Sequence, residues 1–313
     1  MHFYHSLADV TRSERGIALA IGNFDGFHRG HQAVVARMKA KASARNLETA
    51  VMVFEPHPVE FFDNGRHASP RLYSLRDKLL AFSAAGIDKV FCMHFNHQFA
   101  ALSAEEFVEL LAKRIGVVDI TVGTPFSFGS GGKAGIGDLQ RLGALYGIKA
   151  ESIDKVCSDD ERISSTSIRA FLSEGDFDSA IAALGHNYDI SGRVVFGNHL
   201  GRKIGFPTAN VNLQRMVSPL LGVYAVKVRT SYGVFNGVAN VGYRPTVVKD
   251  QVKSLMEVHL IDFNHDLYGQ MITVYFFRKL RDERKFASLE ELKEHITCDK
   301  NNAQAVLEDI DLK

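Results

Sequence analysis

The sequence predicts two domains of different classes: an α/β domain with a parallel, doubly wound sheet, then a domain built on an antiparallel sheet or barrel. The chain has 313 residues, about twice the usual length of one domain. In the first half, short apolar runs alternate with helical patterns, which is typical of a parallel sheet covered by helices. After about residue 185, β-branched runs separated by turn residues replace this alternation. We expect domains at 1–186 and 187–313.

Four apolar runs in the first half are short and continuous, as strands buried on both faces should be. They occupy residues 16–21, 49–54, 88–95 and 118–123. A helix is expected from about Gln32, because apolar residues recur on one side of the segment that follows. A second helix should begin at a capping box formed by Ser103 and Glu106 and end at Gly116.

The second half contains five runs with strand character, at residues 191–196, 222–230, 233–241, 256–262 and 271–277. Ser288 and Glu291 form a further capping box, so the chain should end in helix. Residues 299–310 have the pattern of an amphipathic segment that closes the domain.

Composition and charge exclude several classes of protein. The formal net charge is +1 and the basic residues are scattered, so we expect no nucleic-acid partner. No apolar run approaches the about 18 residues of a membrane span, and the N-terminus lacks the apolar core of a signal peptide. The 3 cysteines are far apart, which argues for a reducing compartment. We therefore expect a cytoplasmic protein without a membrane partner; oligomerisation is left open.

The segment IGNFDGFHRGHQ, residues 21–32, lies between an expected strand and an expected helix. Open α/β sheets bind ligands at such turns, and the free N–H groups of a helix N-terminus favour phosphate. Gly26 and Gly30 let the backbone approach a ligand closely. His28 and His31 share one helix face, so both rings can donate to one phosphate group. This segment predicts a phosphate site.

Two other interpretations of the histidine pair stay open on these residues alone. His28 and His31 could be metal ligands, although no third ligand lies nearby in sequence, or solvated turn residues. The segment ISSTSIRAFL, residues 163–172, is similarly ambiguous. Its hydroxyl side chains and Arg169 form either a second anion-binding helix start or an ordinary N-cap. The full glycine- and histidine-rich string favours phosphate chemistry.

A second constellation, GNHLGRKIGFPTAN, covers residues 197–210. A glycine-rich loop with the cations Arg202 and Lys203 suits nucleotide phosphates, and Thr208 and Asn210 offer oxygen ligands suitable for Mg²⁺. A purely structural cluster of turns is the alternative. Downstream, Glu257 interrupts an apolar strand pattern. It is either exposed on the outer face or, if it faces a pocket, a base for a substrate hydroxyl.

These motifs carry two resemblances. The segments at 21–32 and 163–172, with FEPHP at 54–58, resemble the nucleotidylyltransferase superfamily, which uses an HxGH motif and a late Ser/Thr-rich helix start to bind ATP. The segment at 197–210, with GVANVGYRPTV at 237–247 and LRDERKFASLEEL at 280–292, resembles the riboflavin kinase family. The whole chain is thus similar to prokaryotic bifunctional riboflavin kinases/FAD synthetases.

The resemblance implies a Rossmann-like domain followed by a six-stranded antiparallel barrel with a C-terminal helix. It implies Mg²⁺ and ATP, and riboflavin, FMN and FAD as substrates and products. The C-terminal domain would phosphorylate riboflavin, with Glu257 as the base, and the N-terminal domain would join FMN to AMP with release of pyrophosphate. His28 and His31 would act in that second reaction.

The remaining expected site residues follow by motif. The adenylyltransferase ATP site comprises Gly22, Asn23, Phe24, Asp25, Gly30, Ser164, Ser165, Thr166 and Arg169. The kinase ATP and magnesium site comprises Gly201, Arg202, Lys203, Gly205, Pro207, Thr208 and Asn210, the last two as metal ligands. The flavin contacts are Tyr224, Arg281 and Phe286.

One departure from the family pattern leads to two hypotheses about the activity of the N-terminal domain. Where family members usually carry Asp-Phe-Arg-Phe-Gly, this chain has Pro125 and Ser127 in place of the Asp and the Arg. The leading hypothesis is an enzyme with both activities. The alternative is a riboflavin kinase whose N-terminal domain is impaired in FAD synthesis by the altered loop at 124–129. A third hypothesis, a flavin- or nucleotide-binding regulator without turnover, leaves Glu257 and Thr208 unexplained.

Overall fold

The protein is described from a computed structural model, which covers residues 1–6, 9–63, 70–154, 157–158, 161–197, 201, 204–213, 217–245 and 252–312. The chain forms two compact units. Unit 1 comprises Met1–Ser69 and Lys78–Ser164, and unit 2 comprises Pro70–Asp77 and Ser165–Lys313. Helices α7 (Ser165–Glu174) and α8 (Phe177–Leu184) thus group with unit 2. The expected boundary after residue 186 stays a prediction.

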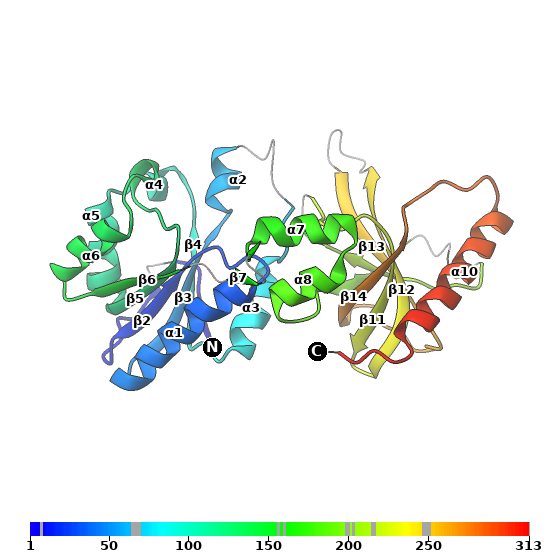
Figure 1. The fold of residues 1–313 in the computed structure, drawn as a ribbon, viewed down its shortest axis with the longest axis horizontal. Helices are drawn as coiled ribbons and strands as arrows, with labels where there is room; N and C mark the ends of the chain where they lie inside the picture. Colours follow the sequence, from blue (N-terminus) through cyan, green and yellow to red (C-terminus); the bar gives the residue numbers. More distant parts are fainter. Residues whose placement is uncertain are drawn as a thin grey trace. The chain divides into compact units, whose positions relative to one another are not determined.

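The described part of unit 1 contains a 6-stranded sheet in the order β1-β4-β3-β2-β5-β6, with every neighbouring pair parallel (Figure 1). Its strands are β1 (His2–Tyr4), β2 (Ile17–Ile21), β3 (Glu48–Glu55), β4 (Lys89–His94), β5 (Val117–Gly123) and β6 (Lys149–Ile153). The four apolar runs became β2 to β5, and β2 is buried throughout. The parallel α/β sheet is confirmed.

The helical elements α1 (Arg29–Arg45), α6 (Ile136–Ala144) and the π-helix η2 (Leu111–Ile115) pack on this sheet through buried apolar residues. Helix α1 packs against β2, β3 and β5, and buries Val34, Val35, Met38 and Ala42. The other helical elements are α2 (Pro58–Phe62), α3 (Leu75–Ala84), α4 (His97–Ala100), α5 (Ala104–Leu110) and the 3₁₀ turn η3 (Ser130–Gly132). The predicted capping box of Ser103 and Glu106 is present, and Gly116 ends the helix in the left-handed conformation.

Unit 2 contains a closed antiparallel barrel, whose described strands follow the order β10-β13-β12-β11-β14-β9 (Figure 1). They are β9 (Asp189–Val195), β10 (Ala209–Asn212), β11 (Gly222–Thr230), β12 (Gly233–Pro245), β13 (Val252–Leu260) and β14 (Met271–Arg281). The strands β7 (Cys157–Ser158) and β8 (Glu161–Arg162) form a separate pair. Helix α10 (Leu289–Leu307) packs on β11, β12 and β14. The six-stranded barrel with its C-terminal helix is confirmed.

Helix α10 is attached to the barrel by a small apolar core. Ala303 and Leu307 of the helix are fully buried against Val223, Ala225 and Val238 of the wall. Its N-terminus is capped by the Ser288 hydroxyl, which accepts a hydrogen bond from the Glu291 N–H at 3.1 Å. Among the described residues, no helix combines the length and the apolar character that crossing a membrane requires.

Candidate active sites

The loop between β2 and α1 lies at the switch point of the unit 1 sheet. The chain leaves β2 at Gly22, and β2 is flanked by β3 on one side and β5 on the other. Because the strand order reverses here, the loops beyond the carboxyl ends of β2 and β5 diverge and leave a crevice, where open α/β sheets bind ligands. The predicted residues Gly22, Asn23, Phe24, Asp25, His28, Gly30 and His31 therefore lie together at this position.

The backbone of this loop is unusual. Phe24 (φ 48°), Gly26 (φ 81°) and Phe27 (φ 42°) all have positive φ, which is uncommon for bulky residues. Both phenylalanine rings pack edge-on against Phe82, with centroids 5.5 and 5.7 Å from it. The packing of these buried rings offsets the backbone strain, and such strain is concentrated at functional sites. The loop conformation is thus held by the core.

The two histidines are held in one fixed arrangement. His28 is the N-cap of α1, and its Nδ1 accepts a hydrogen bond from the His31 N–H at 3.4 Å. Since Nδ1 is an acceptor, the ring proton of neutral His28 lies on Nε2, which can donate to a ligand. The rings are stacked with centroids 3.7 Å apart. A Cβ at Gly30 would lie 3.1 Å from the His28 ring, so glycine at this position leaves room for the stacked pair.

Positive charge is concentrated next to this pair. Burial lowers the pKa of His31 well below its usual value, and His28 and Lys78 lower it further. His57, the residue between two prolines in FEPHP, is buried with its Nε2 2.6 Å from the Nζ of Lys78. Lys78 is itself 1% exposed. A buried lysine among three histidines, one of which is kept neutral, favours an anionic ligand.

The late Ser/Thr-rich segment belongs to both units. Ser164 is the last residue of unit 1, whereas Ser165, Thr166 and Arg169 begin helix α7 in unit 2. Within unit 2, the Arg169 side chain donates to the carbonyl of Pro70. These residues therefore occupy a helix start, as predicted, with the arginine anchored on an adjacent segment.

An aromatic cavity in unit 1 was not predicted. It has a volume of about 250 Å³ and opens beyond the carboxyl ends of β2, β3, β4 and β5. Its lining includes Phe54, Phe62, Phe95, Phe99, Phe107, Phe126 and Phe128. The altered loop contributes Ser127 and Gly129 to the same wall, which continues with Gly131 and Gly132, whereas Pro125 is not part of it. A concave, apolar surface rich in aromatic rings suits a flat conjugated ligand.

In unit 2, a cavity of about 240 Å³ lies on the outer face of the barrel, between its wall and α10. Five strands contribute one residue each to a cross-strand row along it. The row crosses β10, β13, β12, β11 and β14 in that order, and each of its residues pairs with the next. Its residues, in the same order, are Asn210, Glu257, Asn240, Val223 and Arg281. All five line the cavity. The register of the barrel thus brings together residues up to about 70 positions apart.

Strand alternation explains why Glu257 faces this cavity. Met256, Val258 and Leu260 are buried, while Glu257 and His259 between them are only half-buried. Since successive side chains of a strand point to opposite faces, the apolar set faces the barrel core and Glu257 faces outward. The cavity covers this outer face, so Glu257 has the pocket position that the base hypothesis requires.

Glycines shape the loop that leads into β10. A Cβ at Gly201 would lie 2.3 Å from the Phe206 carbonyl and 3.2 Å from the Thr208 hydroxyl, so no larger residue fits. Gly205 has φ +90°, which favours glycine at this turn. Gly201 and Thr208 line the cavity; Gly205 and Pro207 do not. Arg202 and Lys203 lie outside the described residues.

Two amide oxygens in this cavity are buried without a hydrogen-bond partner among the described residues. They are the Oδ1 atoms of Asn210 and Asn240. Asn210 is 6% exposed, and a Cβ at Gly197 would lie 2.3 Å from its amide. An unpartnered amide oxygen beside the Thr208 hydroxyl is a hard donor set, and Mg²⁺ needs few protein ligands when phosphates and water supply the rest. The residues present therefore fit a magnesium ion bound with a nucleotide.

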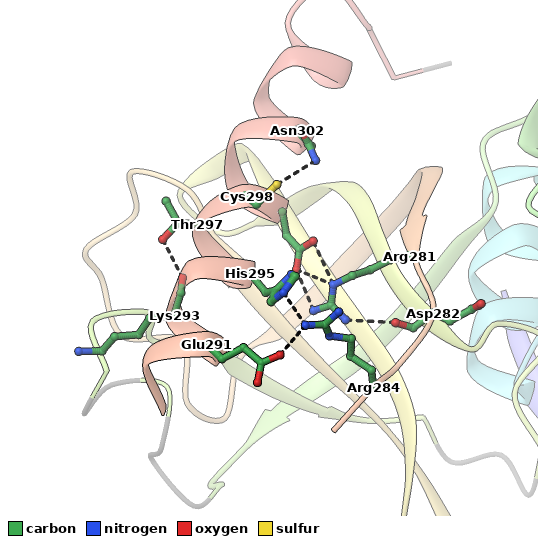
Figure 2. Close-up of polar contacts among 10 residues, drawn as sticks. Arg281, Asp282, Arg284, Glu291, Lys293, His295, Thr297, Cys298 and Asn302 are labelled. Carbon is green, nitrogen blue, oxygen red and sulfur yellow. Dashed lines mark hydrogen bonds and ion pairs between the residues drawn. The ribbon is translucent and has the colours of Figure 1, made fainter. Parts of the chain in front are cut away.

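The segment after β14 closes one side of the cavity. Arg281 makes a bidentate ion pair with Asp299 of α10, at 2.8 to 3.1 Å. Figure 2 shows Arg284 directed toward Glu291 and His295 of the same helix, with which it is hydrogen-bonded. Both guanidinium groups lie near the Phe286 ring, at 5.4 and 4.9 Å from its centroid. The predicted residues Arg281 and Phe286 thus line the cavity.

Tyr224 was expected near the flavin, and its position differs. Its neighbour Val223 lines the cavity, so Tyr224 points to the opposite face of β11. There it packs against Phe276 and Phe177, and its hydroxyl donates to the Leu221 carbonyl at 2.7 Å. Burial raises the pKa of Tyr224 to about 12, which keeps this donor protonated. Tyr224 is a core residue in this position and is left out of the flavin site below.

Comparison with known proteins agrees with this geometry. The FAD synthetase family model matches residues 10–167, and the riboflavin kinase family model matches residues 184–307. The chain is 44% identical over 307 residues to a bifunctional riboflavin kinase/FMN adenylyltransferase from Haemophilus influenzae, covering 97% of this chain and 99% of the relative. It is 45% identical over 302 residues to the protein of the same description from Escherichia coli, covering 96% and 95%.

A solved structure shares the fold over nearly the whole chain. The crystal structure of a macrolide-efflux protein from Streptococcus pneumoniae superposes with a TM-score of 0.79 at 28% identity, covering 96% of this chain and 98% of the other. Both halves of the chain thus match one family. The chain belongs to the bifunctional family in which an FAD synthetase domain precedes a riboflavin kinase domain.

Proposed function

We propose that each unit of this chain carries out one of the two activities of its family. The chain is an enzyme of flavin biosynthesis, a riboflavin kinase and an FMN adenylyltransferase, and its partners are the small molecules riboflavin, FMN and ATP. Unit 2 phosphorylates riboflavin, and unit 1 converts the product FMN to FAD. The observation that carries the assignment is the cross-strand row, which places Glu257 in a cavity beside Asn210.

In the kinase reaction, Glu257 acts as the general base. Its carboxylate accepts the proton of the terminal ribityl hydroxyl as that oxygen bonds to the γ-phosphorus of ATP, and ADP leaves. Arg281 and Phe286 cover the flavin ring, which their position along the cavity supports. Gly201 lets the backbone approach the phosphates. Arg202 and Lys203 remain expected phosphate contacts.

Thr208 and Asn210 would hold Mg²⁺ in this site. When bound, the ion neutralises negative charge on the transferred phosphate. The protein's own contribution is to keep both oxygens in place: Gly197 leaves room for the Asn210 amide, and the Gly201 turn brings the Thr208 hydroxyl to the cavity.

In the adenylyltransferase reaction, a phosphate oxygen of FMN bonds to the α-phosphorus of ATP and pyrophosphate leaves. His28 and His31 donate hydrogen bonds to the phosphate oxygens on which charge accumulates. Lys78 and His57 add positive potential beside them. Ser164, Ser165, Thr166 and Arg169 remain expected ATP contacts. The aromatic cavity of unit 1 takes the flavin ring of FMN, for which its seven phenylalanines are well suited.

The altered loop at 124–129 does not favour loss of this activity. Its Ser127 lies in the wall of an otherwise complete aromatic cavity. Family membership over the full length likewise favours two activities. A cytoplasmic location also stays part of the proposal; Cys92 and Cys298, the free cysteines among the described residues, accord with a reducing compartment.

A Glu257→Gln variant tests the kinase assignment. The amide cannot accept the proton, so the rate of FMN formation from riboflavin should fall about a thousandfold, within the usual range for a general base. FAD formation from supplied FMN should be unchanged, since it occurs in unit 1. Glu294→Gln, on the exposed face of α10, is the matched control. Wild-type kinase activity in the Glu257→Gln variant would exclude this residue as the base.

A further inference from the structure

The cross-strand row contains one polar residue to which no role has been given. Asn240 lies on β12, directly opposite Glu257 on one side and Val223 on the other. Its side chain lines the cavity. The same row carries Asn210 on the far side of Glu257, so two asparagines flank the proposed base.

The Asn240 amide oxygen needs a partner. Its Oδ1 is buried and has no hydrogen-bond partner among the described residues. Buried polar atoms are nearly always satisfied, and an unsatisfied one is unfavourable unless a ligand or water completes it. The neighbours of Asn240 in the row offer no ready donor: Val223 is apolar, and a Glu257 carboxylate only accepts hydrogen bonds. A molecule bound in the cavity can supply the donor that Asn240 lacks among the described residues.

The order of the row assigns Asn240 to one substrate, given the proposed function on which this inference rests. Asn210 and Thr208 are on the nucleotide side of Glu257. Asn240 is on the opposite side, followed by Val223 and then by Arg281 with its neighbouring Phe286. The acceptor must extend from Glu257 toward the apolar wall and the aromatic ring, and it passes Asn240 on the way.

We infer that Asn240 determines specificity for a polyhydroxylated acceptor, by accepting a hydrogen bond from a secondary hydroxyl of its chain. Directly opposite residues of an antiparallel pair have Cβ atoms about 5 Å apart. That separation matches a hydroxyl one or two carbons from the terminal hydroxyl that reaches Glu257. Asn240 therefore positions the chain so that the terminal hydroxyl faces both the base and the nucleotide.

The test compares two acceptors in the full-length enzyme. One is riboflavin. The other is a flavin whose ribityl chain is replaced by a straight pentyl chain with only the terminal hydroxyl. Asn240→Ala should lower kcat/KM for riboflavin about tenfold, mostly through KM, as expected for the loss of one buried hydrogen bond. It should leave kcat/KM for the pentyl flavin and KM for ATP unchanged.

Equal effects of Asn240→Ala on both acceptors, or no effect on either, would overturn the inference, because a structural role cannot distinguish a secondary hydroxyl. Asn240→Ser, which keeps an acceptor oxygen, should restore part of the preference for riboflavin. Asn236→Ala is the matched control, since Asn236 lies on the same face of β12 but outside the cavity. It should behave as the wild type with both acceptors.

Two further readouts separate other causes of failure. KM for ATP in the kinase reaction should be normal in every variant, which shows that unit 2, where the substitutions lie, is intact. If the wild-type protein itself forms no FMN from riboflavin, the proposed function fails, and this inference fails with it. If the wild type forms FMN but accepts the pentyl flavin equally well, only the inference about Asn240 is overturned.

Discussion

Two glycines determine where proposed reactive groups of this enzyme lie. Gly30 leaves space for the stacked rings of His28 and His31, and Gly201 lets the Phe206 carbonyl and Thr208 approach the loop backbone. In each case a Cβ would displace a proposed functional group, so the glycine is needed for a close approach rather than for flexibility. The sequence motifs are recognisable because their spacing preserves these approaches.

His28→Ala should affect one activity alone. It removes a ring that accepts a hydrogen bond from the His31 N–H and that we propose donates to the phosphate, so the rate of FAD formation from FMN should fall at least a hundredfold, as for other single donors to a transition state. The rate of FMN formation from riboflavin should stay normal. The two rates are measured separately by chromatography of the flavins. An unchanged FAD rate would contradict the role given to the 21–32 segment.

The lowered pKa of His31 predicts a pH dependence of stability. Above about pH 6.5 the ring is neutral in both folded and unfolded chains. As the pH falls below that value, the unfolded chain binds a proton that the folded site resists, so the free energy of unfolding decreases, by at most about 1.4 kcal/mol per pH unit. Hydrogen exchange of α1 amides between pH 7.5 and pH 5 measures this change.

His31→Gln should flatten that pH dependence, because it removes the titrating ring. The exposed His2→Gln is the control and should keep the wild-type slope. A wild-type slope in His31→Gln would mean that another group of unit 1 is responsible.

At the scale of elements, strand register and alternation decide which residues meet. Glu257 and Arg281 become neighbours of one cavity because β10, β13, β12, β11 and β14 are aligned in the barrel. Alternation along β13 and β11 then sends Glu257 and Val223 to the cavity, and Tyr224 to the core. The cavity is completed by α10, so its attachment to the barrel should matter to the kinase.

Leu307→Ala tests that attachment. Leu307 is fully buried in the core between α10 and the barrel, so its truncation should lower the free energy of unfolding of unit 2 by about 3 kcal/mol. Urea unfolding followed by circular dichroism measures the change. Leu289→Ala on the same helix, at 50% exposure, should change stability by less than about 0.5 kcal/mol. Equal effects of the two substitutions would contradict the packing described here.

The elements that could be predicted from the sequence are those specified by local patterns of a few neighbouring residues. The buried strands β2 to β5, the capping box at Ser103 and the position of the histidine loop follow from apolar runs and motif spacing. The short strands β1 and β6 were missed: β1 has only 3 residues, and β6 carries Lys149 and Glu151 at the sheet edge. Neither has the apolar run that marks a buried strand.

Features that depend on register or on distant segments could not be predicted. The aromatic cavity draws Phe54 from strand β3 and Phe95 and Phe128 from two different loops, and no period in the sequence connects them. Asn240 lies in the 237–247 segment that carries part of the family resemblance, but the sequence assigned it no role, and only its pairing with Glu257 suggests one. Tyr224 was expected beside the flavin, but it is Val223, its neighbour in sequence, that lines the cavity, since a one-residue offset along a strand reverses the face.

At the scale of the whole molecule, the two units have separate sheets and separate cavities. The product of the unit 2 reaction is the substrate of the unit 1 reaction. The kinase cavity belongs to unit 2 and the histidine loop to unit 1, so a substitution at either of them should leave the other reaction active in the same chain.

A mixture of two inactive variants tests this separation. Neither Glu257→Gln nor His28→Ala should convert riboflavin to FAD at a useful rate alone, because each blocks one step. Together they should do so, since FMN released by the His28→Ala protein is adenylylated by the Glu257→Gln protein. Doubling the concentration of either variant alone is the control. No FAD from the mixture, with both single activities intact, would show that FMN does not exchange between molecules.

The measurement that tests the central claim most directly is a time course with the purified wild-type protein, riboflavin, ATP and Mg²⁺, in which the three flavins are separated chromatographically. The account predicts that FMN appears first and FAD follows, which requires both units and shows that the altered loop is tolerated. FMN that accumulates without FAD, even when FMN is supplied directly, would contradict the claim of two activities and point to Pro125 and Ser127 as the cause.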